Sequence, residues 1–300
     1  MASMQSKLML LFVRHVLTNF IKWSSLKQSR KFFDIRGRSI RLPKRLKREK
    51  VDAGGVPAEF LCGPDAKEDK VLVYLHGGGF CLGSCDAYRS AAVTIAQAAK
   101  MRLFIMEYRL APEFPYPCGL NDIVAAYKWL LEHGISPKNI ALAGDSAGGN
   151  LVVAAALSLR EKKIPLPGAL VCLSPWLDLS KAREGYVTKA NSDLILTPKV
   201  LKELASYYVG NNNYQDPLIS PSYADLTGLP PILIQVGSRE IILDDATGLA
   251  EHARNAGVDV TLQVWEDMWH IWQVLEVRLP ESKRAIREIG DFMRKHLKEI

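Results

Sequence analysis

A serine between glycines at positions 144–148 is the strongest chemical signal in the chain. The segment reads Gly-Asp-Ser-Ala-Gly, follows the apolar run 140–143 and precedes an apolar stretch of helical length. This pattern between a strand and a helix is typical of a nucleophile elbow, a strained turn that points the serine hydroxyl out of a sheet. The flanking glycines leave room for the crowded backbone because they have no Cβ. We therefore predict that Ser146 is a nucleophile for acyl transfer.

Three consecutive glycines follow the apolar run 71–75, in the sequence His-Gly-Gly-Gly-Phe at 76–80. Such a segment can curl so that its backbone N–H groups point at one spot. We predict that the amides of Gly77 and Gly78, together with that of Ala147, form an oxyanion hole for a tetrahedral intermediate. His76 is expected to orient this loop rather than to act as the base.

The catalytic base is expected late in the chain, because hydrolases with a nucleophile elbow usually follow the order nucleophile, acid, histidine. Of the six histidines, His270 lies in a loop after the strand-like run 258–265. His252 and His296 fall inside predicted helices. We therefore predict that His270 is the base.

The acid is expected after the strand-like run 232–236. Glu240 lies in the loop that follows this run, whereas Asp244 stands where a helix is predicted to begin and fits a helix N-cap. We predict that Glu240 orients the histidine and stabilises its imidazolium form. Asp244 remains the alternative acid.

Taken together, these motifs resemble the hormone-sensitive-lipase-like family of esterases and lipases. The resemblance is carried by HGGGF at 76–80, YRLAPE at 108–113, GDSAGGN at 144–150 and DPLISP at 216–221, and it covers roughly residues 55–275. It implies acyl chains of modest length, a cap built from the N-terminus and an insertion, and frequent homodimers. Three positions depart from the family pattern. Glu240 stands where Asp is usual, and the usual His-Gly-Phe reads His270-Ile271-Trp272.

Strand-like and helix-like stretches alternate along the chain and must position these residues. Short apolar runs that fit buried strands occupy residues 71–75, 103–108, 140–143, 169–173, 232–236 and 258–265. Helix-length segments occupy residues 87–100, 120–132, 147–161, 244–255 and 281–298. This order predicts an α/β fold of the α/β-hydrolase type, with a mostly parallel, doubly wound sheet flanked by helices and a helical cap.

Two regions lie outside this alternation and are predicted to form the cap. Residues 1–45 are expected to be an N-terminal helical cap segment, and residues 46–300 the catalytic domain, with 176–230 as a second cap insertion that includes a helix at 198–209. Apolar residues at helical spacing near the N-terminus predict an amphipathic helix that covers the site or lies on a membrane surface: Leu8, Leu11, Phe12, Val16, Phe20 and Trp23.

The charge of the chain is unevenly distributed. Residues 1–50 contain 14 Lys and Arg against two acidic residues, so they carry a net charge of +12, and the other 250 residues carry −5. A basic front could contact an anionic lipid surface, whereas the sparse aromatic residues beside it argue against nucleic-acid binding. The five cysteines form no metal-like pair, and a reducing, cytoplasmic location is expected.

We therefore expect a carboxylic ester hydrolase with a Ser-His-Glu triad that acts on short- to medium-chain acyl esters. We expect it to need no cofactor and no metal. The expected partner is a small-molecule ester, with transient lipid-surface contact through the basic N-terminus and a homodimer as further possibilities. The alternatives are a lipid-directed peripheral membrane hydrolase and a non-catalytic ligand-binding protein on the same scaffold.

Overall fold

A computed structural model gives the fold. It describes residues 3–6, 9, 25–40, 42–180, 185–190, 192–193, 195–275 and 277–297. The amphipathic helix predicted from Leu8, Leu11, Phe12, Val16, Phe20 and Trp23 lies outside these residues. Within the described ranges, no helix has both the length and the apolar character needed to cross a bilayer.

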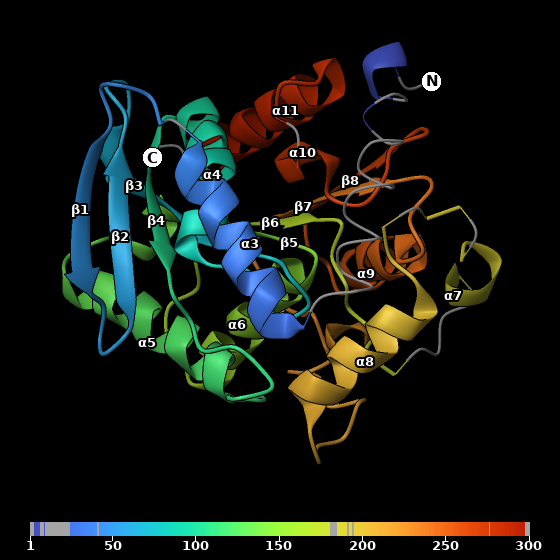
Figure 1. Ribbon diagram of the computed structural model, residues 1–300. Helices are drawn as coiled ribbons and strands as arrows, with labels where there is room; N and C mark the ends of the chain where they lie inside the picture. The colour runs from blue at the N-terminus through green and yellow to red at the C-terminus, as the bar shows by residue number, and fades with distance from the viewer. Residues whose placement is uncertain are drawn as a thin grey trace.

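A single eight-stranded sheet forms the centre of the molecule, in the order β1-β2-β4-β3-β5-β6-β7-β8 (Figure 1). Its strands are β1 Lys47–Asp52, β2 Pro57–Cys62, β3 Lys67–Leu75, β4 Met101–Met106, β5 Ile140–Asp145, β6 Ala169–Leu173, β7 Ile232–Gly237 and β8 Val260–Trp265. Strands β3 to β8 pair in parallel, while β1 and β2 add an antiparallel edge. The predicted mostly parallel sheet is confirmed.

The helices lie on both faces of this sheet. They are α3 Leu26–Ser39, α4 Cys85–Ala99, α5 Cys118–Glu132, α6 Ala147–Glu161, α7 Gly185–Thr188, α8 Pro198–Val209, α9 Leu243–Asn255, α10 Trp272–Leu275 and α11 Pro280–His296. Alternate residues of β3 enter two separate cores. Val71 and Val73 belong to the core that contains apolar residues of α5, α6 and α9, whereas Leu72 and Tyr74 belong to the core that contains apolar residues of α4 and α11. The sheet is therefore doubly wound, as predicted.

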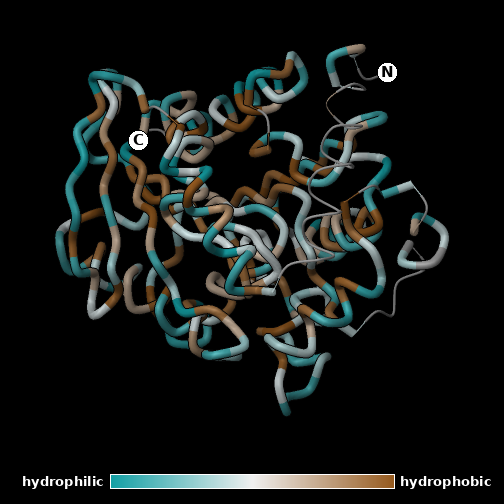
Figure 2. Tube along the Cα trace, in the orientation of Figure 1, coloured by the Kyte–Doolittle hydropathy of each residue, from teal (hydrophilic) through white to brown (hydrophobic). Residues whose placement is uncertain are grey.

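Burial explains why the central strands form where the apolar runs occur. All residues of β5, β6 and β7 are buried, which fits strands covered by helices on both faces. Figure 2 shows apolar residues concentrated along the central strands and hydrophilic residues along β1 at the edge. The carboxyl ends of β5, β7 and β8 lead into the loops that hold the predicted site residues.

Two helices from the predicted cap regions pack on this framework. In α3, Ser25 and Gln28 form a capping box, and the far end of the helix lies so close to α4 that a Cβ on Gly37 would come within 2.1 Å of the Asp86 carbonyl oxygen. In α8, Thr197 caps the first turn and Leu204 lies against Gly79 of the glycine-rich loop.

Candidate active site

Ser146 occupies a sharp turn between β5 and α6. Its backbone has φ 54° and ψ −119°, a conformation that residues other than glycine rarely adopt. Close backbone contacts explain the glycines on either side. A Cβ on Gly144 would lie 2.5 Å from the Gly148 carbonyl oxygen, and one on Gly148 would lie 2.0 Å from that of Leu75. The local sequence therefore encodes the strained elbow.

The predicted serine, histidine and glutamate lie in one hydrogen-bonded chain. Ser146 Oγ is 2.9 Å from His270 Nε2, and His270 Nδ1 is 2.8 Å from Glu240 Oε2. All three side chains are buried, and Ser146 is 6% exposed. With the Nδ1 proton directed at the carboxylate, Nε2 is free to accept the serine proton.

The electrostatic environment favours the protonated form of His270. Burial opposes a charge on the ring, but the hydrogen bond and negative charge of Glu240 outweigh it, with smaller contributions from Asp193 and Asp145, so the pKa of His270 is raised above its ordinary value. Such a ring is a stronger base toward the Ser146 hydroxyl than an isolated imidazole.

Glu240 is held by contacts besides the one to histidine. Its Oε1 accepts hydrogen bonds from the Ser174 hydroxyl and from the Gly237 N–H, both at 2.6 Å. Asp244, the alternative acid, lies in the first turn of α9, whose N-cap is Ile242 rather than Asp244. Sequence reasoning missed Ser174, since a lone serine after β6 carries no recognisable signal.

One member of the predicted oxyanion hole is otherwise engaged. The Gly77 N–H donates to Asp145 Oδ1 at 3.1 Å, so the expectation that this amide faces the oxyanion does not fit the structure. The amides of Gly78, Gly79 and Ala147 have no hydrogen-bond acceptor among the described residues. Gly78 and Gly79 have φ values of +107° and +61°, which glycine adopts readily. Gly79 was not among the predicted donors.

His76 lies against the glycine-rich loop and not at the Ser146 hydroxyl. The ring stacks between Tyr88 and Tyr108, and its Nδ1 is 2.8 Å from the Gly77 carbonyl oxygen. Burial lowers its pKa to about 4, so the ring is neutral near pH 7 and its Nδ1–H donates a hydrogen bond to that carbonyl oxygen. These contacts agree with the expectation that His76 orients the loop.

Asp145 holds the glycine-rich loop from the side of the sheet. Its Oδ1 accepts hydrogen bonds from the Tyr74 hydroxyl at 2.8 Å and from Gly77 N–H. The side chain is fully buried, and burial raises its pKa to about 6. Asp145, the first x residue of the Gly-x-Ser-x-Gly motif, is therefore part of the scaffold around the serine.

Arg30 of α3 holds the other side of the same loop. Its guanidinium donates to the carbonyl oxygens of Cys81 and Ala111, each at 2.7 Å, and forms two 2.8 Å hydrogen bonds with Glu113. From α8, Tyr208 stacks on Phe80 with ring centroids 3.8 Å apart. Segments from both predicted cap regions thus contact the residues that follow the glycines.

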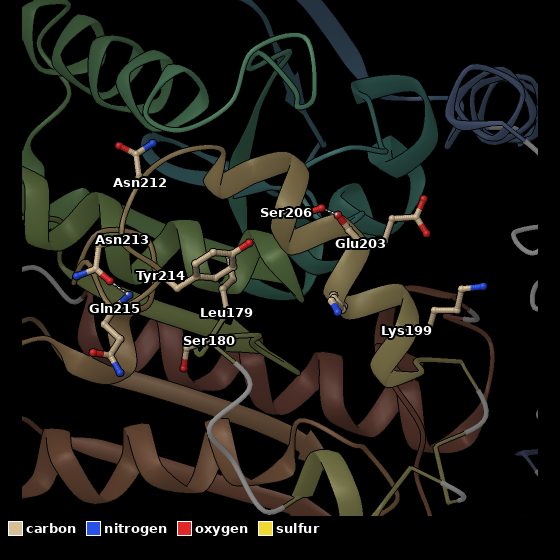
Figure 3. A pocket seen from close by; sticks show the side chains of 10 residues that line it. Leu179, Ser180, Lys199, Glu203, Ser206, Asn212, Asn213, Tyr214 and Gln215 are labelled. Atoms are coloured by element: carbon tan, nitrogen blue, oxygen red, sulfur yellow. Dashed lines mark hydrogen bonds between the residues drawn. The ribbon is translucent and has the colours of Figure 1, made fainter.

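A cavity of about 760 Å³ lies beside α8 (Figure 3). It is lined by exposed residues of that helix, by the 212–215 loop and by Leu179 and Ser180. None of the predicted catalytic residues lines it. The described residues contain no group of three or more His, Cys, Asp or Glu side chains placed to hold a metal ion.

Fold and site together define the class of this protein. The chain belongs to the α/β-hydrolase fold family, whose model matches residues 72–274. It is 42% identical over 244 residues to an acetyl-hydrolase of Streptomyces hygroscopicus, an alignment that covers 81% of each chain.

Two solved structures extend the similarity to nearly the whole chain. An esterase from the bacterial hormone-sensitive lipase family is 44% identical, with a TM-score of 0.95 over 99% of this chain and 100% of that one. EstE5, in a crystal soaked with p-nitrophenyl butyrate, is 35% identical, with a TM-score of 0.93 over 99% of both chains. The resemblance to hormone-sensitive-lipase-like esterases is confirmed.

Proposed function

We propose that this chain is a carboxylic ester hydrolase in which Ser146, His270 and Glu240 form the catalytic triad. The observation that carries the proposal is the unbroken contact chain from Ser146 Oγ through the His270 ring to Glu240 Oε2, with both distances below 3 Å. The fold family and the names of the relatives support ester hydrolysis as the reaction.

The first half of the reaction is acylation of the enzyme. His270 Nε2 removes the Ser146 proton as Oγ forms a bond to the ester carbonyl carbon. The carbonyl oxygen becomes an oxyanion, and we assign its stabilisation to the amides of Gly78, Gly79 and Ala147, which have no acceptor among the described residues. Collapse of this intermediate breaks the bond to the alcohol oxygen, and His270 gives its proton to the leaving alcohol.

The second half returns the free enzyme. His270 removes a proton from water, and the hydroxide attacks the acyl carbon on Ser146. The Ser146–acyl bond breaks, the carboxylic acid leaves, and the proton returns to Oγ. Glu240 keeps the ring in the tautomer that both halves require and stabilises its positive charge. Ser174 and the Gly237 amide keep Glu240 in place.

We propose short- to medium-chain acyl esters as substrates. An acetyl-hydrolase and a relative soaked with p-nitrophenyl butyrate are consistent with small acyl groups.

We further propose that residues 1–45 and 176–230 form a cap on a catalytic domain of residues 46–300. Arg30, Leu204 and Tyr208 support this division, because each contacts the glycine-rich loop or its neighbours. Homodimer formation, contact with a lipid surface and a cytoplasmic location stay predictions that these observations do not address.

The triad is tested by two substitutions and one control, with p-nitrophenyl butyrate as the substrate. Ser146→Ala is expected to lower kcat by about 10⁴-fold or more and to abolish labelling by an organophosphonate. Glu240→Gln should lower kcat by about 10⁴-fold, since it leaves the histidine in the wrong tautomer. Asp244→Asn should leave kcat near wild type. Near-normal hydrolysis by Ser146→Ala contradicts the proposal, and loss of activity in Asp244→Asn alone reassigns the acid.

A further inference from the structure

The loop that carries Glu240 is hydrogen-bonded to a segment of the proposed cap. This acid loop, residues 238–242, connects β7 to α9. Three hydrogen bonds join it to residues that precede α8: Lys189 Nζ to the Ser238 carbonyl oxygen (3.0 Å), Ser192 Oγ to the Arg239 carbonyl oxygen (3.0 Å), and the Ile241 N–H to Asp193 Oδ2 (2.9 Å). The cap segment therefore contacts successive peptide groups on both sides of Glu240.

Asp193 is the central residue of this contact. Its side chain is buried, at 6% exposure, and its Oδ1 accepts the N–H groups of Ile195 and Leu196 at 2.9 Å each. The other oxygen accepts the N–H of Ile241, the residue directly after Glu240. One carboxylate thus satisfies three backbone donors and ties the turn before α8 to the acid loop.

We propose that Asp193 is a positioning residue of the triad: its carboxylate fixes the peptide group that follows Glu240 and presents a second negative charge toward His270. The inference rests on the proposed ester hydrolase function. It adds a residue of the cap to the machinery that sets the geometry and the basicity of the catalytic histidine.

The electrostatic half of this role follows from the carboxylates around the ring. Glu240 contacts Nδ1 directly, while Asp193 and Asp145 act through their charge from the cap segment and from the end of β5. Asp193 is one of the groups that raise the pKa of His270. Because the ring must be neutral to accept the serine proton, activity rises as pH rises through this pKa. Removal of the Asp193 charge should therefore move the acid limb of the pH profile to lower pH.

The substitution Asp193→Asn in the full-length chain tests both the positioning role and the electrostatic role of this carboxylate. An amide has a single acceptor oxygen, so at least one of the three N–H groups loses its partner. We expect kcat for p-nitrophenyl butyrate to fall by about 10- to 100-fold, with KM changed by less than about twofold, since the histidine is misoriented while the substrate still binds. The acid limb of kcat/KM should move to lower pH.

The matched control is Asp225→Asn. This exposed aspartate likewise accepts a backbone N–H, that of Thr227, and its replacement changes the net charge by the same amount. It should retain the wild-type kcat and pH profile. A kcat for Asp193→Asn equal to that of the control overturns the proposal, and so does a lowered kcat with an unmoved acid limb, which indicates a merely structural role.

A measurement without turnover separates this inference from the proposed function. The pKa of the His270 ring, followed by NMR in protein with ¹⁵N-labelled histidine, should be lower in Asp193→Asn than in wild type whether or not esters are cleaved. Asp193→Glu is the second test variant, to be used if Asp193→Asn does not fold. Its charge is retained but displaced by one methylene, so we expect a lowered kcat with the wild-type acid limb. A wild-type kcat in Asp193→Glu contradicts positioning.

Discussion

Asp145 shows how a residue next to the proposed nucleophile can oppose stability while it supports the site. The carboxyl group is buried beside Ser146, and its Oδ2 has no hydrogen-bond partner among the described residues. Burial raises its pKa from 3.8 to about 6. A raised carboxyl pKa means that the folded state binds the proton more tightly than the unfolded chain. Stability therefore falls as pH rises from about 4 to 6, and the full cost of the charge is present above pH 6.

Asp145→Asn is expected to stabilise the protein at pH 8, since the amide carries no charge and its oxygen still accepts from Tyr74 and Gly77. We expect the free energy of unfolding in urea to rise by about 1–2 kcal/mol at pH 8, and the gain to shrink as the pH is lowered from 6 to 4. Asp65→Asn, at an exposed position, is the control for net charge. Lower stability of Asp145→Asn at pH 8 contradicts this account.

At the scale of elements, the half-buried Arg30 is one of the residues that join α3 to the rest of the chain, beside Asp34, which accepts a hydrogen bond from Ser84, and Arg38, which pairs with Asp86. Arg30 donates to the carbonyl oxygens of Cys81 and Ala111, and those groups would lose their partners without it. The hydrogen bonds to Glu113 add less, because that side chain is 54% exposed and water screens the pair. The carbonyl contacts therefore dominate the stabilising effect.

Arg30→Met should lower the free energy of unfolding by about 1–3 kcal/mol, the cost of leaving hydrogen-bond partners of this kind unsatisfied. Urea denaturation measures it. Arg36→Met is the matched control on the same helix, because Arg36 is exposed and its side chain has no partner among the described residues. Equal stability of the two variants means that α3 is held by other contacts.

For the whole molecule, the contacts among Ser146, His270 and Glu240 arise entirely from elements after residue 46. A chain that begins at residue 46 should keep the complete eight-stranded sheet, since β1 starts at Lys47. It would lose α3 and two Arg30 hydrogen bonds, one to Cys81 in the loop after the glycines and one to Ala111 in the loop after β4. The cap division thus predicts a folded but impaired enzyme.

We expect the shortened chain to be labelled at Ser146 by an organophosphonate and to show the circular dichroism of a folded α/β protein. Its urea midpoint should be lower than that of the full chain, and its kcat reduced, because the loop that is proposed to supply the oxyanion amides has lost a support. Failure of the chain from residue 46 to fold shows that residues 1–45 belong to the catalytic domain and not to a separable cap.

Most of the sheet could be predicted from the sequence, because strands buried on both faces appear as uninterrupted apolar runs. The antiparallel strands β1 and β2 were not predicted. The residues of β1, Lys-Arg-Glu-Lys-Val-Asp, are almost all exposed and contain no apolar run, and the strand forms through its pairing with β2. β8 is also shorter than the run at 258–265, since its pairing with β7 begins at Val260.

The proposed nucleophile, the late histidine and the glutamate could be picked out from the sequence alone, because each depends on neighbours close along the chain: glycines that permit a strained turn, and loops at the ends of apolar strands. The tertiary structure decided which groups these residues meet. The Gly77 N–H donates to Asp145, which lies 68 residues away in the sequence. Ser174 donates to Glu240 across a separation of 66 residues, and Asp193 accepts from Ile241 across a separation of 48 residues. The direction of an N–H group and the partner of a carboxylate depend on how distant segments pack, and no local pattern encodes them.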